Sequence, residues 1–354
     1  MQRSAHWIPR LLLALALACA PALAAAAPAT EVAWVSAGTD AEVEHAFAQA
    51  RADGKPLLLY WGAKWCPPCN QLKATLFNRQ DFIERSRAFV PVYVDGDLPG
   101  AQKLGARFKV RGYPTMILFD ALGTEITRLP GEVDAPQVMR VLQLGLAGGR
   151  PVKAVLADAK AGKSLSPNEW RMLAFYSWDT DEAQLVPEAD RAALLVTLAA
   201  ACPRAETETA TRLWLKALSQ SDDGKGVKAD AALRERVLKV LADGPASRAQ
   251  MDVLTAAAPE IVRALGGGPQ ERATLLAAYD RALQRIEADT TLSRADRMSA
   301  VIARIDLARI DLPKDAKGVK LPAPLVKDVR EQVARADREI PDGYERPAVI
   351  TGAA

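Results

Sequence analysis

Two kinds of hydrophobic pattern alternate along residues 32–149. Leu57–Trp61 and Phe89–Val94 are continuous apolar runs, which are typical of strands buried on both faces of a sheet. Thr115–Phe119 and Glu125–Leu129 flank a turn and predict an antiparallel hairpin. Apolar residues at helical spacing predict helices between Thr39 and Gly54, from about Cys66 to Phe77, from about Gln102 to Val110, and from about Ala135 to Leu146. This order predicts an α/β fold with a mixed sheet and helices on both faces.

The pattern changes at Gly148-Gly149-Arg150-Pro151, where strand signals end and Ala, Leu, Arg and Glu begin to dominate. We therefore expect an α/β domain at residues 30–149, an all-α domain at 151–340 and an irregular tail at 341–354. Helices are expected after Ser166-Pro167, Pro187, Arg204, Lys228, Ser247, Pro269 and Ser293, and around Pro324–Glu339. The recurring breakers favour a helical-hairpin array, and an irregular all-α domain of seven to nine helices is the alternative.

The first residues have the layout of a secretory signal peptide. Arg3 and Arg10 form a basic region, residues 11–18 are apolar but too few to span a bilayer, and Ala22-Leu23-Ala24 resembles a cleavage site. We predict a signal peptide at residues 1–24 and export of the mature protein, to a bacterial periplasm. A retained signal anchor and lipid attachment at Cys19 are the alternatives.

Composition limits the classes of partner. The 354 residues are 49% hydrophobic and 25% charged, which is ordinary for globular domains, and the length suits about two of them. The formal charge of +3 falls to +1 without Arg3 and Arg10. Such a balance gives no field that attracts nucleic acid or an anionic membrane, so we expect no nucleic-acid partner.

Three cysteines remain once Cys19 leaves with the signal: the close pair Cys66 and Cys69, and Cys202. The pair follows a buried strand and opens a helix, where free backbone N–H groups favour a thiolate at Cys66. Cys69 lies one turn later, within reach for a disulfide. A static disulfide or half of a zinc site is the alternative, but zinc needs four ligands and only His45 would be left as a histidine. We expect no metal and no cofactor, since phosphate and dinucleotide motifs are missing as well.

Two segments resemble the thioredoxin superfamily, in particular its exported disulfide-interchange members: Tyr60–Cys69 and Val110–Thr115, with Gly131 fitting as well. The resemblance covers about residues 32–149. It implies that Cys66 attacks a client disulfide, that Cys69 resolves the mixed disulfide, and that the Tyr113–Pro114 bond is cis. The residues that would contact a client are Trp65, Pro67, Pro68, Tyr113 and Pro114. The implied partners are client proteins with disulfides and an unidentified membrane or soluble electron donor.

This sequence departs from the thioredoxin pattern at two positions, and from the pattern of the superfamily's strong oxidants at a third. Tyr60 stands where thioredoxins have a buried Asp, and the usual nearby Lys falls at about Pro91. Pro68 stands where strong oxidants of the superfamily have a His that stabilises the thiolate. The missing Asp and Lys favour a dedicated periplasmic relative over a fast general reductant. Pro67 and Pro68 remove two N–H donors near the sulfur, which favours a reductase, and an oxidase or isomerase is the alternative. A rival of another class is a scaffold protein whose helical domain binds a partner and whose cysteine pair is slow or vestigial.

Other conspicuous residues are expected to be structural. Cys202 is interpreted as a buried free thiol and His45 as a surface residue. Trp170, Phe175, Tyr176 and Trp178 are predicted to form the helical core or its seam with the first domain, with peptide binding as the alternative. Asp179, Asp181 and Glu182 are interpreted as a solvated helix end.

Overall fold

The computed structural model describes residues 30–129, 135–181, 184–221, 224–312 and 320–339. The predicted signal peptide, the predicted tail, Gly131 and Glu182 lie outside these residues. We call residues 30–146 the N-terminal region and residues 152–339 the helical region.

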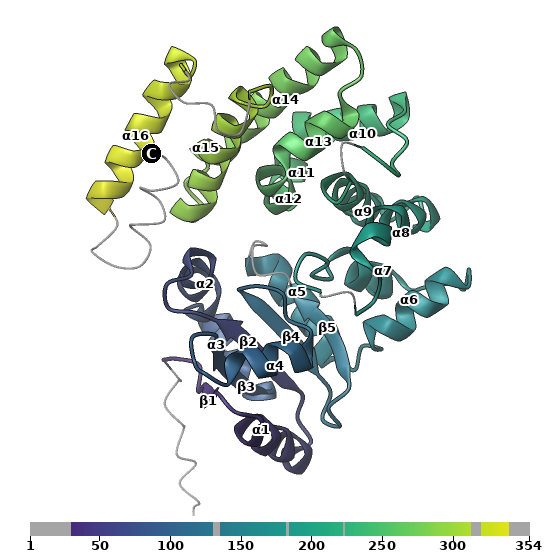
Figure 1. Cartoon of the computed structure of the whole chain (residues 1–354), viewed down its shortest axis with the longest axis vertical. Helices are drawn as coiled ribbons and strands as arrows, with labels where there is room; N and C mark the ends of the chain where they lie inside the picture. Colours follow the sequence, from purple (N-terminus) through teal and green to yellow (C-terminus); the bar gives the residue numbers. More distant parts are fainter. Residues whose placement is uncertain (1–29, 130–134, 182–183, 222–223, 313–319, 340–354) are drawn as a thin grey trace, which may run out of the picture.

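The N-terminal region is built on a five-stranded mixed sheet with the strand order β1-β3-β2-β4-β5 (Figure 1). The central strand β2 runs parallel to β3 and antiparallel to β4, so that Leu59 pairs with both Val92 and Ile117. This arrangement confirms the predicted mixed sheet and hairpin. The strands are β1 (Val35–Ala37), β2 (Leu57–Gly62), β3 (Val90–Asp95), β4 (Thr115–Phe119) and β5 (Glu125–Leu129).

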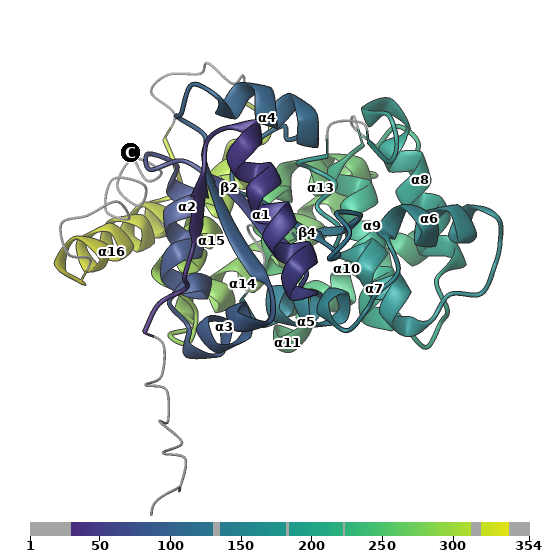
Figure 2. The same cartoon turned by 90° about the horizontal axis from the view of Figure 1, so that it is seen from below.

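Helices cover both faces of the sheet because successive residues of β2 point to opposite sides. Leu57, Leu59 and Trp61 pack with α1, which is nearest the viewer in Figure 2, and with α4, which is at the top of that view. Leu58 and Tyr60 pack on the other side, with α2, α3 and α5. The bounds are α1 (Asp40–Asp53), α2 (Pro67–Leu72), α3 (Gln80–Arg85), α4 (Ala101–Phe108) and α5 (Ala135–Leu146).

Three local features differ from the sequence prediction. The helix expected from Cys66 to Phe77 is α2 followed by a π-helical turn at Lys73–Phe77. The strand β1 and the helix α3 were not predicted, because a strand of three residues and a helix of six carry too little periodicity to be recognised. The helix α1 begins as expected, with a capping box between Thr39 and Glu42.

The helical region follows as a series of helices that arch above the sheet (Figure 1). Within its described residues there are eleven, more than the seven to nine of the irregular alternative. They are α6 (Val152–Lys160), α7 (Pro167–Ala174), α8 (Glu188–Ala201), α9 (Thr207–Ser219), α10 (Ala231–Ala242), α11 (Gly244–Ala249), α12 (Met251–Ala256), α13 (Ala258–Leu265), α14 (Pro269–Ala288), α15 (Arg294–Ala308) and α16 (Ala323–Glu339). Sequential neighbours α8 and α9 pack together, as do α14 and α15.

Most predicted helix starts are confirmed, but the start expected after Ser247 is wrong. Ser247 lies inside α11, which begins at Gly244. The Asp243 carboxylate accepts the Ala246 N–H at 2.7 Å and caps this helix. The Asp-Gly-Pro sequence therefore begins a helix as well as ending the preceding one, because Pro245 is compatible with a first helical turn. The helices α6 and α13 were not predicted.

The two regions share one hydrophobic core. Leu118 and Leu129 of the sheet belong to the same buried cluster as Trp170, Phe175, Tyr176 and Trp178, which confirms the prediction of a core or seam for these aromatic residues. The helix α7 packs on α5, and α6 packs on β5. The boundary that we predict at residues 148–151 falls between α5 and α6, and the continuous core makes the helical region a fixed neighbour of the sheet.

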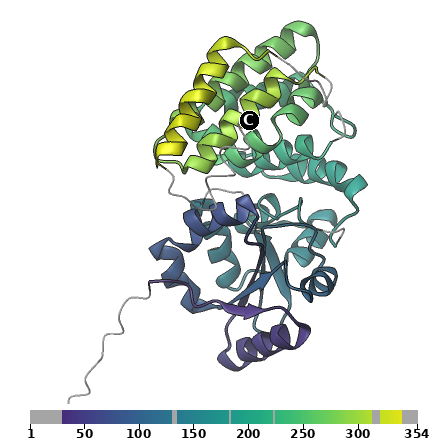
Figure 3. The same cartoon turned by 60° about the vertical axis from the view of Figure 1, so that its left-hand side comes forward.

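The far end of the arch returns to the N-terminal region. Gln71 Nε2 of α2 donates to Asp296 Oδ1 of α15 at 2.7 Å. In Figure 3 the helices near the C-terminus lie directly above the helices of the N-terminal region. Among the described residues, no helix combines the length and the apolar character needed to cross a lipid bilayer.

Candidate functional site

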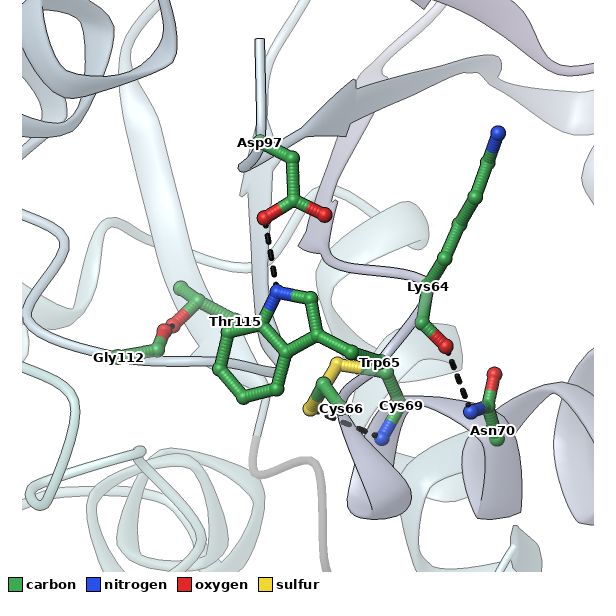
Figure 4. The surroundings of a disulfide bond; sticks show 8 residues. All are labelled: Lys64, Trp65, Cys66, Cys69, Asn70, Asp97, Gly112 and Thr115. Atoms are coloured by element: carbon green, nitrogen blue, oxygen red, sulfur yellow. Dashed lines mark hydrogen bonds between the residues drawn. A yellow bond between two sulfur atoms is a disulfide. The ribbon is translucent and has the colours of Figure 1, made fainter. Parts of the chain in front are cut away.

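The cysteine pair lies where the central strand β2 passes into α2. Cys66 is the N-cap of α2, and its Sγ accepts the Cys69 N–H at 3.3 Å (Figure 4). Cys66 and Cys69 are joined by a disulfide, with Cα atoms 5.2 Å apart, and both are buried. The strand end fixes the position of Cys66, and one helical turn brings Cys69 back beneath it. The pair is therefore preorganised to form and break one bond.

The loop before the pair is held by hydrogen bonds on both sides. Trp65 is 65% exposed, and its indole Nε1 donates to Asp97 Oδ1 at 2.8 Å. On the opposite side, the buried Asn70 donates to Lys64 O at 2.9 Å (Figure 4). The structure thus keeps a large apolar ring exposed and oriented beside the disulfide.

The second predicted segment lies against the disulfide. The peptide bond between Tyr113 and Pro114 is cis, and Pro114 is buried. Tyr113 packs on Ala63 and the two cysteines, and its ring centroid lies 6.3 Å from that of Trp65. Tyr113 Oη donates to Gly96 O at 3.3 Å. Of the predicted client-contacting residues, Trp65, Tyr113 and Pro114 are thus brought together around the cysteines.

The two prolines between the cysteines form the first turn of α2. Proline has no N–H, so this turn lacks two backbone donors that a helix start normally offers. Pro68 is half-buried.

The β3–α4 loop contributes residues that the sequence analysis missed. Asp97 orients Trp65, and Gly96 lies so close to Tyr113 that a Cβ at this position would come within 2.3 Å of the Tyr113 ring. The signal was present in Asp95-Gly96-Asp97, a polar turn directly after a buried strand. Loops at the carboxyl ends of parallel strands lie at one edge of a sheet, next to the end of β2.

Tyr60 replaces the buried acid with a neutral side chain. Its hydroxyl is buried and has no hydrogen-bond partner within the described structure. Burial raises the pKa of Tyr60 far above its ordinary value, and the nearby Tyr93 adds to the shift. A phenol of this kind holds its proton at neutral pH, so Tyr60 is not a base for Cys69.

Tyr60 lies beside Tyr93 of β3. Pro91 pairs with Leu58, whereas Tyr93 pairs with Tyr60 and stacks on it with ring centroids 5.4 Å apart. Burial raises the pKa of Tyr93 to about 12. Lys73 Nζ lies 5.8 Å from the centroid of the Tyr93 ring. Sequence counting did not find the pair because the parallel register of β2 and β3 decides which residues are neighbours.

The remaining candidates lie outside this site. Cys202 is a buried free thiol, and burial raises its pKa to about 11, with the nearby Glu206 acting in the same direction. His45 is exposed on α1. Within the described ranges, no group of three or more His, Cys, Asp or Glu residues is arranged to hold a metal ion.

The expected solvated helix end at residues 179–182 is wrong for Asp181. Asp181 is 1% exposed and lies in the seam between the two regions, where its Oδ2 accepts the Leu185 N–H at 3.1 Å. Asp179 pairs with Lys216 at 2.6 Å. Sequence alone missed this because the groups that accompany these carboxylates come from distant segments of the chain.

Comparisons with known proteins agree with the site geometry. The thioredoxin-like domain family matches residues 43–145. The chain is 33% identical over 107 residues to the thiol:disulfide interchange protein DsbD of Pseudomonas fluorescens, and 34% identical over 99 residues to that of Yersinia pestis. These matches cover 29% and 27% of this chain, and 18% and 16% of the relatives. The chain therefore spans less than a fifth of the length of these relatives.

Solved structures give similar neighbours for about a third of the chain. A thioredoxin from Thermus thermophilus is 24% identical and has a TM-score of 0.29, covering 33% of this chain and 88% of the thioredoxin. The DsbH oxidoreductase is 22% identical with a TM-score of 0.28, covering 35% of this chain and 89% of DsbH. The family match, the strand order and the cysteine pair identify the N-terminal region as a thioredoxin-like domain.

Proposed function

We propose that this protein is an exported thiol–disulfide oxidoreductase that reduces disulfides in client proteins, with Cys66 attacking and Cys69 resolving. The observation that carries the proposal is the Cys66–Cys69 disulfide at the start of α2, packed against Tyr113 and flanked by the exposed Trp65. The similarity of residues 43–145 to thioredoxin-like domains supports the same chemistry.

The reaction begins from the reduced pair. The Cys66 thiolate attacks one sulfur of a client disulfide, the client S–S bond breaks, and the departing client thiolate takes up a proton. Cys69 then loses its proton and attacks Cys66 Sγ, which releases the second client thiolate and leaves the Cys66–Cys69 disulfide. Two electrons have passed from the pair to the client, Cys69 has given up one proton to water or to a client group, and the second client thiolate takes up a proton from solvent. A dithiol donor restores the reduced pair by the same exchange in reverse order.

The surroundings of Cys66 support the reducing direction. An oxidant of this type needs its reduced form stabilised by donors around the thiolate. Pro67 and Pro68 offer no backbone N–H, and the described hydrogen bond to Cys66 Sγ comes from Cys69 N at 3.3 Å. With Tyr60 neutral, water or a group of the client accepts the Cys69 proton.

The cellular setting follows from the predicted signal peptide at residues 1–24. An exported reductase works in an oxidising compartment, so its electrons must come from a membrane or soluble dithiol donor. The disulfide-interchange names of the similar proteins agree with such a setting.

Trapping of the mixed disulfide tests the proposal. Cys69→Ala removes the resolving thiol, and we expect client proteins to remain attached to Cys66 through a bond that dithiothreitol releases. The doubly substituted Cys66→Ser, Cys69→Ala chain should capture none. Cys202→Ala is the matched control, because it removes a buried thiol and leaves the pair intact. Turnover of a disulfide substrate that persists in Cys66→Ser would contradict the assignment, and a wild-type chain without any turnover would favour the scaffold alternative.

A further inference from the structure

The backbone that leads into Pro114 is held by the helical region. Arg111 N–H donates to Thr180 O at 3.4 Å, and Val110 forms an antiparallel bridge with Asp181. The Arg111 guanidinium also pairs with Glu188, the first residue of α8. Residues 110 and 111 therefore have a short strand-like partner that comes from outside the thioredoxin-like domain.

A buried arginine holds the two residues just before this bridge. Arg128 of β5 is fully buried, and its Nη1 donates to Lys109 O at 2.7 Å while Nη2 donates to Phe108 O. Glu125 balances the charge with hydrogen bonds of 2.8 and 3.2 Å. Arg128 thus fastens the end of α4 to the edge strand of the sheet.

The same guanidinium also contacts the helical region. Arg128 Nη2 donates to Gln184 Oε1 at 3.1 Å, and Nη1 lies 3.9 Å from Asp181 Oδ1. Arg191 of α8 in turn donates to Asp181 O at 3.1 Å. Arg128 and Asp181 therefore connect the Phe108–Arg111 backbone to β5 and to the start of α8. We call these contacts of Arg128 and Asp181 the clamp.

The clamped backbone contains an unfavourable conformation. Lys109 has φ = 54°, in the left-handed region that residues with a Cβ adopt infrequently. Such a conformation persists when the surroundings hold it, and here the Lys109 carbonyl is held by Arg128. The path from Lys109 to Pro114 is thus maintained by contacts outside the segment itself.

We propose that Arg128 and Asp181 are positioning residues for client capture. They hold residues 108–111 so that the backbone of Tyr113 stays beside the disulfide and can pair with an extended client segment, a role that rests on the proposed function. Because Arg111 N–H is already bonded to Thr180, the client strand cannot continue along the bridge. The clients selected in this way present their disulfide on a short extended segment.

The helical region also provides a matched control. Arg212 of α9 is fully buried like Arg128, and it pairs with Asp252 through hydrogen bonds of 2.6 and 2.9 Å. Its other partners are Ala174 O, Gln250 and the ring of Phe175, whose centroid lies 4.0 Å from the guanidinium carbon. None of these contacts reaches the Phe108–Arg111 backbone, so Arg212→Lys perturbs a buried guanidinium without releasing the clamp.

Kinetics of the full chain test the proposal, with dithiothreitol as electron source. Insulin is the substrate with a protein disulfide, and dithiobis-nitrobenzoate is the substrate with a small-molecule disulfide. We expect Arg128→Lys to raise the KM for insulin about tenfold, and Asp181→Asn to raise it about threefold, through loss of client positioning. The rate constant with which the pre-reduced pair reduces dithiobis-nitrobenzoate, measured after the dithiothreitol has been removed, and the reduction potential of the pair should both match the wild-type values. Arg212→Lys should leave all of these unchanged.

Hydrogen exchange gives a readout that needs no client. The Arg111 amide is bonded to Thr180 O, and we expect its exchange to accelerate about tenfold in Arg128→Lys and Asp181→Asn but not in Arg212→Lys. An unchanged KM in both clamp variants, or an equal increase in Arg212→Lys, overturns the proposal. If the wild-type chain does not reduce insulin, amide hydrogen exchange at Arg111 tests the clamp by itself. In that case an exchange rate that does not increase in Arg128→Lys and Asp181→Asn overturns the proposal. A wild-type chain that reduces neither disulfide instead refutes the proposed function.

Discussion

The stability difference between the oxidised and reduced forms gives the direction of electron flow. Only two residues separate Cys66 from Cys69, and closing so short a loop in the unfolded chain stabilises the folded protein by about 2 kcal/mol in the chain-entropy model. Against this, the start of α2 stabilises a Cys66 thiolate in the reduced form by about 0.3–1 kcal/mol. The oxidised form is therefore expected to be more stable than the reduced form by about 1–2 kcal/mol.

This difference is a difference in reduction potential. For a two-electron couple, about 30 mV corresponds to about 1.4 kcal/mol, so the native pair should be about 20–40 mV more reducing than the same pair in the unfolded chain. Equilibration with glutathione redox buffers, in native conditions and in concentrated urea, measures both potentials. Alkylation and mass analysis give the oxidised fraction of Cys66 and Cys69. A native potential about 30 mV or more above the unfolded one would mean a stabilised thiolate and would refute the reducing direction.

A companion variant tests the reasoning from the prolines. Pro68→His restores a backbone N–H and adds a side-chain donor near Cys66, at a half-buried position. One charge-assisted hydrogen bond contributes about 1.5–3 kcal/mol, which should raise the native potential by about 30–60 mV. A potential that stays the same would show that donors in this turn do not control the pair.

Three further predictions concern buried groups. In Tyr60→Phe, loss of a hydroxyl without a partner should leave turnover intact and raise the free energy of unfolding by about 1 kcal/mol; a tenfold fall in turnover would instead implicate the hydroxyl in proton transfer. Burial raises the pKa of Cys202 to about 11, so its thiol stays protonated at neutral pH and its rate of alkylation by iodoacetamide should keep rising up to that pH; a plateau near pH 9 would contradict this. Asp252→Ala leaves the Arg212 charge buried without its counter-ion and should cost about 3–5 kcal/mol in thermal unfolding with an unchanged reduction potential; a cost below about 1 kcal/mol would contradict the importance of this pair.

The helical region contacts the N-terminal region on two sides of the cysteine pair. It touches α2 through Asp296 and the segment before Pro114 through Thr180 and Asp181. The shared core and the buried Arg128 fix the helical region beside both of these segments.

The thioredoxin-like domain could be predicted from local patterns. The apolar run at Leu57–Trp61, the hairpin around Leu122-Gly123 and the cysteines at a strand-to-helix transition each depend on neighbours within a few residues. Local conformation follows from side-chain periodicity, turn residues and helix starts, which the sequence displays directly.

Tertiary structure alone decided which distant residues meet. The register of two parallel strands placed Tyr93, and not Pro91, beside Tyr60. Arg128 and Asp181 look like ordinary charged residues in the sequence, yet both are buried in the seam because carbonyls, a carboxylate and a guanidinium from three segments accompany them there. Burial of a charge depends on partners far along the chain, and no local pattern records where the fold will bring those partners.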